Sequence, residues 1–195
     1  EATAAAVAAA VRAMFMGKAG KYAVFFPSYL YMGMVAEQLS DLPLMVQETG
    51  MDEEKRADFI GAFTRDEQPL LALCVLGGIF AEGIDLPGRA LIGVCVVGVG
   101  LPQIGPEREA IREQVENSGH KGFDIAYRYP GMHKVLQAAG RLIRSDSDRG
   151  VLLLCDDRYG QPDYFNLLPP HYRVTRARGG EIEGHIKEFW GREQS

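Results

Sequence analysis

Two arginines near residue 140 form the pattern with the clearest chemical meaning in this sequence. Arg141 and Arg144 follow Gln137 and Gly140 in the stretch QAAGRLIRSDSDRG, residues 137–150. On a helix, Gln137, Arg141 and Arg144 fall on one face, at offsets of 0, 4 and 7. A guanidinium is planar, permanently charged and forked, so two of them one turn apart can bracket phosphate oxygens. The alternative is that these side chains form the solvated face of an amphipathic helix.

A glycine-rich stretch, GGIFAEGIDLPG at 77–88, directly follows the apolar run LLALCVL. Gly77 and Gly78 remove two side chains where that run ends, so a phosphate or a sugar can approach the backbone closely. Asp85 follows Gly83 and can accept a hydrogen bond from a ribose hydroxyl or from a bound water. The alternative is a glycine-rich turn in which Asp85 caps a short helix.

A third candidate loop, Pro27-Ser28-Tyr29, follows the apolar run YAVFF at 22–26. Proline ends the run, and Ser28 suits the N-cap position of a following helix. The free N–H groups and the positive dipole end of that helix would suit a phosphate, including one of a nucleic-acid backbone. Simple capping by Ser28 is the alternative, because serine is common at this position.

Other patterns resemble known motifs but lack an essential part. The stretch GKAGK at 17–21 lacks the spacing and the Ser or Thr of a phosphate loop, and GVGLPQ at 98–103 departs from the dinucleotide fingerprint at its last position. The acidic residues 52–54 suit the first turn of a helix better than a metal site. The sequence therefore contains no complete phosphate loop, and we predict no metal site in this chain.

The cysteines and the charge balance limit the class of protein. Cys74, Cys95 and Cys155 each lie in an apolar run without metal-ligand spacing, which predicts buried, reduced thiols in a cytosolic protein. The net charge of -5 argues against binding nucleic acid by bulk electrostatics alone. Basic side chains nevertheless outnumber acidic ones between residues 120 and 150, so we expect one cationic surface.

The length of 195 residues, 47% of them hydrophobic, suffices for one full core, and we expect a single domain over residues 1–195. No uninterrupted apolar run reaches the roughly 18 residues of a membrane helix, so we expect a soluble chain without a membrane partner. The chain begins EATAAAVAAAVR, with neither an initiating Met nor a basic leader. We therefore expect it to be a segment of a longer protein.

Short apolar runs predict the strands that must position these loops. They lie at 22–26, 42–46, 70–76, 90–99 and 151–155. Runs that do not alternate with polar residues are typical of strands buried on both faces of a parallel sheet. Segments between them have a helical period, and the last of these has an apolar face formed by Val135, Leu136, Ala139, Leu142 and Ile143. The alternation predicts an open α/β sheet, in which ligands bind at the carboxyl ends of the strands.

Five stretches together resemble one known family. In chain order, YAVFFPSY, GGIFAEGIDLPG, GVGLPQIGPERE, YPGMHKVLQAAGRLIRSDSDRG and VLLLCDDRY are similar to the second RecA-like lobe of DinG/XPD-type superfamily 2 helicases. The resemblance runs from residue 21 to residue 170. It implies a RecA-like open, mainly parallel sheet with helices on both faces. It also implies the C-terminal motor lobe of an ATP-dependent DNA helicase, travelling 5′ to 3′.

The resemblance assigns roles in ATP binding to two motifs. Motif VI corresponds to QAAGRLIR, so Gln137, Arg141 and Arg144 would face ATP in the cleft between two lobes, with Arg144 as the arginine finger. Motif V corresponds to GGIFAEGIDLPG, in which Gly83 and Asp85 would sense the nucleotide. The phosphate loop and the Mg²⁺-binding acidic box belong to the first lobe, which is absent from this chain. That absent half carries an iron–sulfur cluster in many members of the family.

The resemblance also implies contacts to single-stranded DNA. Motif IV corresponds to FFPSY, with Ser28 and Tyr29 as the contacts, and Gly77 and Gly78 of motif V would lie near the DNA backbone. The implied partners are single-stranded DNA and the missing first lobe, in the cytoplasm or, in a eukaryote, the nucleus. The alternative is a stand-alone module that binds nucleic acid or nucleotide without catalysis.

Overall fold

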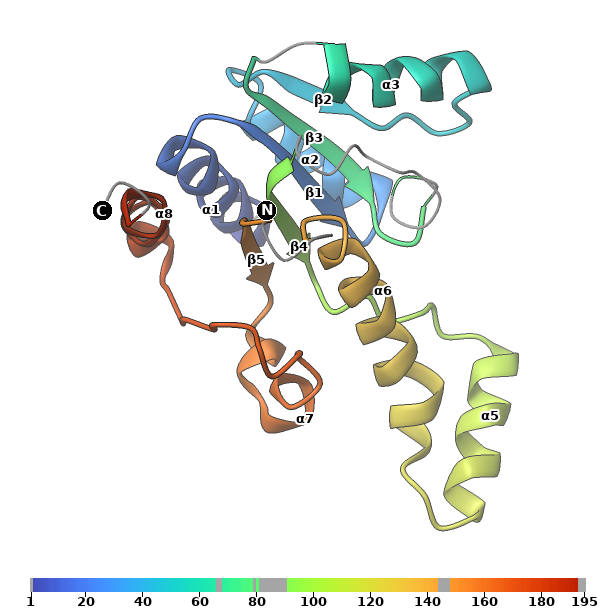
Figure 1. Cartoon of the computed structure of the whole chain (residues 1–195). Helices are drawn as coiled ribbons and strands as arrows, with labels where there is room; N and C mark the ends of the chain where they lie inside the picture. The colour runs from blue at the N-terminus through green and yellow to red at the C-terminus, as the bar shows by residue number, and fades with distance from the viewer. Residues whose placement is uncertain (1, 66–67, 79, 81–90, 144–147, 193–195) are drawn as a thin grey trace.

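A sheet of five parallel strands forms the centre of the structure (Figure 1), a computed structural model that describes residues 2–65, 68–78, 80, 91–143 and 148–192. The order of the strands is β2-β3-β1-β4-β5. Their bounds are β1 (Lys21–Phe26), β2 (Leu44–Val46), β3 (Leu70–Val75), β4 (Leu91–Val97) and β5 (Val151–Cys155). Each strand falls within one of the apolar runs or extends it by a single residue, so the prediction of a parallel α/β sheet is confirmed.

Helices cover both faces of this sheet, as predicted. One core contains side chains of α1 (Ala2–Gly17), α2 (Tyr29–Gln38) and α8 (Ile182–Gly191), packed on the strands. The core on the other face contains side chains of α3 (Glu53–Arg65) and α6 (Tyr129–Ala139). The described residues also form α5 (Pro106–Asn117), a π-helix (Asp124–Arg128), α7 (Pro162–Phe165) and two short 3₁₀ helices (Asp157–Gly160 and Gly179–Glu181). No helix of the described residues is long and apolar enough to cross a membrane.

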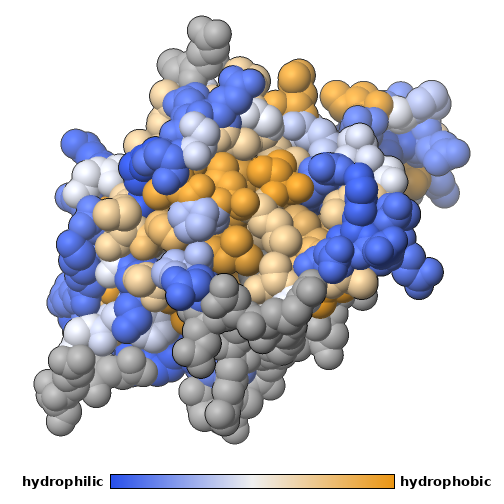
Figure 2. Space-filling model, turned by 90° about the horizontal axis from the view of Figure 1, so that it is seen from above, coloured by the Kyte–Doolittle hydropathy of each residue, from blue (hydrophilic) through white to orange (hydrophobic). Residues whose placement is uncertain are grey.

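The burial of each strand follows its place in the sheet. All six residues of β1 are buried between β3 and β4, whereas β2 and β5 are edge strands whose residues are mostly half-buried. Figure 2 views the molecule from above, the side on which β2 and α3 lie in Figure 1, and apolar side chains gather near the middle of this face. The apolar runs of edge and central strands look alike in sequence, but β2 and β5, which pack against the cores on both faces, are buried less completely than predicted.

The edge position of β5 also changes one prediction about the cysteines. Cys74 and Cys95 are buried, but Cys155, the last residue of β5, is half-buried. All three are free thiols, and the Sγ atoms of Cys95 and Cys155 lie 3.8 Å apart. Burial raises the pKa of the Cys74 thiol, which disfavours its reactive thiolate form.

The sequence analysis assigned no helix to α5, which extends away from the sheet together with the first part of α6 (Figure 1). Its start nevertheless carries local signals, because Gly105 is the N-cap, Pro106 follows directly, and Glu107 and Glu109 lie in the first turn. Arg108 of α5 donates to the backbone oxygen of Ala126 in the π-helix, over 3.2 Å. This bond helps to join α5 to the segment that leads into α6.

Candidate functional site

The carboxyl ends of β1, β2 and β3 bring several candidate residues to one edge of the sheet. Ser28 and Tyr29 follow β1, Gln47 follows β2, and Gly77 and Gly78 follow β3. Because the three strands are adjacent and parallel, these residues lie close together although they are far apart in the sequence. The structure therefore groups all four residues that the resemblance assigned to DNA contact.

Ser28 is the N-cap of α2. Its backbone is extended, with φ −159 and ψ 157, and its hydroxyl accepts a hydrogen bond from the N–H of Tyr31 over 3.2 Å. The prediction that Ser28 caps a helix is thus confirmed. Tyr29 is the first residue of α2 and is 38% exposed, so part of its ring lies on the surface at this edge.

Gln47 connects Tyr29 to β3, and the sequence analysis did not identify it. This residue is only 4% exposed. Its side-chain oxygen accepts from the N–H of Val75 over 2.8 Å, and its side-chain nitrogen donates to the Tyr29 hydroxyl over 2.9 Å. No local pattern marks it, because the role depends on the pairing of β2 with β3.

The glycine pair after β3 lies against two other elements. Gly77 has φ +75, a conformation that favours glycine, and a Cβ there would be 3.2 Å from Nζ of Lys134 in α6. A Cβ on Gly78 would be 3.4 Å from the side-chain nitrogen of Gln47. The Gly77–Gly78 turn therefore has Gln47 on one side and a cationic side chain, Lys134, on the other.

The end of α6 differs from the prediction. The helix ends at Ala139 with Gly140 as its C-cap, so Arg141 lies in the following turn and does not continue the helical face of Gln137. Gln137 is exposed and Arg141 half-buried. The helix therefore ends before Arg141, earlier than predicted, and the two residues lie at the end of α6 and in the turn after it.

The reason for this early end is a contact made after the helix. Leu142 is buried, and a Cβ on Gly150 would be only 2.4 Å from it, so Leu142 packs directly against the residue that precedes β5. Ile143, predicted on the apolar face, is instead 46% exposed.

Three of the predicted nucleotide-binding residues lie outside the part of the chain that the structure describes. They are Gly83, Asp85 and Arg144. Their roles stay predictions from the resemblance. Among the described residues, no group of three or more His, Cys, Asp or Glu side chains could hold a metal ion.

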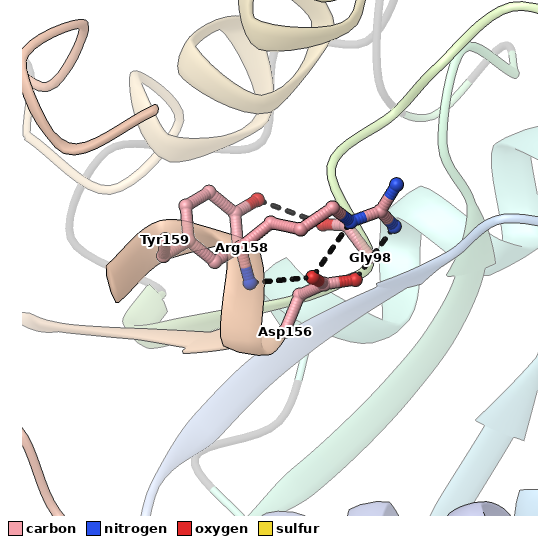
Figure 3. A network of polar contacts seen from close by, with 4 residues as sticks. All are labelled: Gly98, Asp156, Arg158 and Tyr159. Atoms are coloured by element: carbon pink, nitrogen blue, oxygen red, sulfur yellow. Dashed lines mark hydrogen bonds and ion pairs between the residues drawn. The ribbon is translucent and has the colours of Figure 1, made fainter. Parts of the chain in front are cut away.

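A polar network holds the loop after β4 to the end of β5 (Figure 3). The Asp156 carboxylate accepts from the backbone N–H of Arg158 over 2.9 Å and from its guanidinium over 2.8 Å. The Tyr159 hydroxyl donates to the backbone oxygen of Gly98 over 2.7 Å, and the Gly98 N–H donates to the backbone oxygen of Cys155 over 3.1 Å. The network thus fixes the loop that α6 packs against.

The pKa of Asp156 reflects this network. Burial opposes ionisation of the carboxyl, but the hydrogen bonds from Arg158 outweigh burial and hold the pKa below its usual range. In the unfolded chain, the pKa of an aspartate carboxyl is near 4. Because the pKa of Asp156 is lower in the folded chain, its ionised form stabilises the fold at pH values above about 4. This stabilisation is lost as the pH falls through the folded-state pKa. Asp156 therefore stabilises the fold at neutral pH and not in strong acid.

We expect Asp156→Asn to lower the free energy of unfolding of this chain by about 0.5 to 1 kcal/mol at pH 7, since the partner Arg158 is partly exposed to screening solvent. The difference from wild type should shrink as the pH is lowered below about 4. Urea unfolding at several pH values measures this, with the exposed neighbour Asp157→Asn as the control. Equal pH dependence in wild type and Asp156→Asn would contradict the assignment.

The cationic surface expected between residues 120 and 150 is weakened by internal pairing. Arg128 contacts the carboxylates of Asp124 over 2.6 Å and Asp163 over 3.2 Å, and only 13% of its side chain is exposed. Its guanidinium also lies 5.0 Å from the centre of the Tyr164 ring. Arg128 therefore joins the π-helix to α7 and adds little positive charge to the surface.

A hollow of about 350 Å³ near α7 contains none of the predicted site residues. It is lined by Gly160, Pro162, Phe165, Asn166, Val174 and Arg176. The Arg176 guanidinium donates to the backbone oxygen of Gly160 over 2.8 Å, so this cation contributes to local structure. The predicted site residues that the structure describes instead lie at the carboxyl ends of β1 and β3, at the end of α6 and in the turn that follows α6.

The parallel sheet with helices on both faces has the RecA-like architecture. A family model described as "Helicase C-terminal domain" matches residues 11–175, and the chain belongs to this family. Its relatives further identify it as the C-terminal lobe of a DinG/XPD-type superfamily 2 helicase.

Among curated proteins, the ATP-dependent DNA helicase DinG of Photobacterium profundum is 32% identical over 165 residues, covering 77% of this chain and 23% of the relative. A probable ATP-dependent helicase of Methanocaldococcus jannaschii is 30% identical over 143 residues, covering 69% of this chain and 21% of the relative. The chain thus spans less than a quarter of the length of either relative. Both relatives are described as ATP-dependent helicases, and together with the family match they support a helicase motor-lobe role for this chain.

Solved structures agree with this assignment. An apo XPD structure is 25% identical, with a TM-score of 0.65, over 82% of this chain and 33% of that chain. The C-terminal domain of the DEAD-box protein Dbp5 is 16% identical, with a TM-score of 0.59, over 96% of this chain and 92% of that domain. The second likeness shows the fold alone, and it supports the RecA-like architecture predicted from sequence.

Proposed function

We propose that this chain is the second motor lobe of an ATP-dependent DNA helicase that moves 5′ to 3′ on single-stranded DNA. Its first lobe, elsewhere in the full-length protein, would hold the phosphate loop and Mg²⁺, because this sequence contains no complete phosphate loop. This lobe would supply the arginines that complete the ATP site. It would also supply one of the two grips on the DNA strand.

The observation that carries the proposal is the course of α6 across the sheet. Lys134 lies against Gly77, just beyond the carboxyl end of β3, whereas Leu142 packs against Gly150, just before the amino end of β5. Gln137 at the end of α6 and Arg141 in the following turn are therefore displaced along the strands from the edge where Tyr29 lies. One lobe offers two separate surfaces, as a motor needs if it binds a strand at one and ATP at the other.

The chemistry of these residues suits phosphoryl transfer. Gln137 can donate through its amide, and Arg141 and Arg144 can donate through guanidinium groups, to phosphate oxygens on which charge accumulates during transfer. If both arginines contact ATP only when the lobes close, ATP binding favours the closed state. Hydrolysis then removes these contacts and permits opening. Gly83 and Asp85 would report the state of the nucleotide to the neighbouring DNA-binding loop.

Strand movement follows if the two lobes hold DNA in turn. Ser28, Tyr29, Gly77 and Gly78 would form the grip of this lobe, with backbone N–H groups at the start of α2 facing a phosphate. Tyr29 is 38% exposed, and its aromatic ring offers a surface on which a base can stack. Each closure would move this grip relative to the one on the first lobe.

The isolated chain is expected to bind single-stranded oligonucleotide weakly and to hydrolyse no ATP, whereas the full-length protein binds it well and hydrolyses ATP in response. Fluorescence anisotropy with labelled oligo(dT) over a salt series measures binding, and a coupled assay measures turnover. Unwinding of a duplex with a 5′ tail, and not of one with a 3′ tail, checks the direction of travel. Absence of DNA-stimulated turnover in the full-length protein would contradict the proposal.

The same assays test the alternative, a stand-alone binding module without catalysis. Such a module should bind DNA with a dissociation constant of about 1 μM or below and with a steep dependence on salt, without any second lobe. The net charge of -5 disfavours this outcome. Tight binding by the isolated chain, together with no turnover in the full-length protein, would establish it.

A further inference from the structure

The side-chain amide of Gln47 is held in one orientation. β2 ends at Val46. Beyond that point, the backbone N–H of Val75 on β3 donates to the side-chain oxygen of Gln47 over 2.8 Å. The Gln47 backbone N–H itself donates to Leu73 over 2.9 Å. Because the oxygen is used by Val75, the nitrogen must face the Tyr29 hydroxyl, 2.9 Å away. The side chain thus continues the β2–β3 pairing beyond the end of the strand.

Tyr29 is therefore fixed at both ends. Its backbone is the first residue of α2, next to the capped Ser28, and its hydroxyl is bonded to a residue that is only 4% exposed. The residue remains 38% exposed, at the edge where the Gly77–Gly78 turn also lies against Gln47. A ring that is held still before a ligand arrives loses less conformational entropy when the ligand binds.

We propose that Gln47 is a positioning residue, which holds the Tyr29 ring as a stacking surface for one base of single-stranded DNA. The inference rests on the proposed function, because it requires that Tyr29 contacts DNA. It adds a residue that touches no DNA itself and acts only through the Tyr29 hydroxyl. It also explains why a neutral amide suits this position, since one end must accept from Val75 and the other must donate to tyrosine.

Three variants of the full-length protein separate the ring from its anchor. Tyr29→Ala removes the stacking surface. Tyr29→Phe keeps the ring and the bond between Gln47 and Val75 but removes the hydroxyl that is bonded. Gln47→Met keeps the volume of the side chain and loses both amide bonds. The matched control is Gln38→Met, the same substitution at an exposed glutamine of α2, the helix that begins with Tyr29.

The readouts are the affinity for labelled oligo(dT) and the yield of photocrosslinking between residue 29 and an oligonucleotide that carries 5-iododeoxyuridine. We expect Tyr29→Ala to weaken binding by roughly 5- to 100-fold, as for loss of a stacked base. Tyr29→Phe and Gln47→Met should each weaken it by about 3- to 10-fold, with a lower crosslinking yield. Their double variant should show no further loss, because both changes remove the same bond.

The outcomes distinguish the inference from the proposed function. If Tyr29→Ala weakens binding while Tyr29→Phe and Gln47→Met bind and crosslink like wild type, Gln47 does not position the ring. If Tyr29→Ala binds like wild type, the DNA contact itself is refuted and the inference with it. Urea unfolding of each variant shows whether it is folded, and if Gln47→Met is not, Tyr29→Phe decides the question because it leaves the bond to Val75 in place.

Discussion

Replacing Arg144 by alanine in the full-length protein is expected to reduce DNA-stimulated ATP turnover by about 10³-fold or more. An arginine that reaches ATP from a second lobe stabilises charge on the transferring phosphoryl group, and this charge is largest in the transition state. The loss should therefore appear in kcat, with a smaller change in KM. Lysine at 144 should restore little, because an ammonium group lacks the planar, forked geometry of a guanidinium.

The matched control for this experiment is Arg192→Ala. Arg192 follows α8, whose core lies on the opposite face of the sheet from α6, and its guanidinium forms an ion pair with the exposed carboxylate of Glu188 on α8. We expect turnover close to wild type. Binding of oligo(dT) by Arg144→Ala should also stay near wild type, which separates a defect in ATP hydrolysis from a defect in DNA contact. Normal turnover in a folded Arg144→Ala protein would show that the motif VI arginines are solvated surface side chains that take no part in ATP hydrolysis.

The sheet could be predicted from sequence because its signal is local. A strand buried on both faces needs apolar residues at successive positions, and β1 (Lys21–Phe26) has them from Tyr22 onward, as does β4 (Leu91–Val97) except at Gly93. The same rule could not separate central from edge strands. β5 has the equally apolar sequence VLLLC, and only the order of the strands leaves its residues half-buried.

The candidate site was predictable only in part, because several of its contacts join distant segments. Ser28 and the glycine pair carry local signals, a capping residue and a turn after a strand. Gln47 carries none, since its bonds to Tyr29 and Val75 exist only once β2 lies beside β3. The end of α6 was misplaced for the same reason, because the packing of Leu142 against Gly150 is not visible in the helical period.

Another contact between segments that are far apart in the sequence sets the position of α6. Gly100, in the loop after β4, has φ +66, and a Cβ there would be only 2.6 Å from the backbone oxygen of Gly131 in α6. A Cβ on Gly131 would in turn be 2.6 Å from the backbone oxygen of Val99. Neither partner is a flexible side chain, so any added atom must move the loop or the helix. The two glycines allow α6 to approach the sheet closely.

Gly100→Ala should therefore be strongly destabilising, with two costs. Alanine at positive φ costs about 1 to 2 kcal/mol, and overpacking against Gly131 adds about 1 to 3 kcal/mol. Gly98→Ala is the matched control, since Gly98 also has positive φ, +82, but a Cβ there meets nothing within 4 Å. Urea unfolding of this chain should thus give a larger loss for Gly100→Ala than for Gly98→Ala. Equal losses would mean that the close approach to α6 contributes nothing.

The same pair of variants connects the fold to catalysis. If α6 and the turn after it bring Gln137 and Arg141 to ATP, a shift of the helix by about 1 Å can cost up to about 100-fold in rate, because the donors no longer meet the phosphate oxygens. Gly100→Ala in the full-length protein is then expected to lower DNA-stimulated turnover well beyond the effect of Gly98→Ala, at a temperature where both variants are folded. Equal turnover in the two would show that ATP hydrolysis tolerates movement of α6, and the role proposed for its end would have to be abandoned.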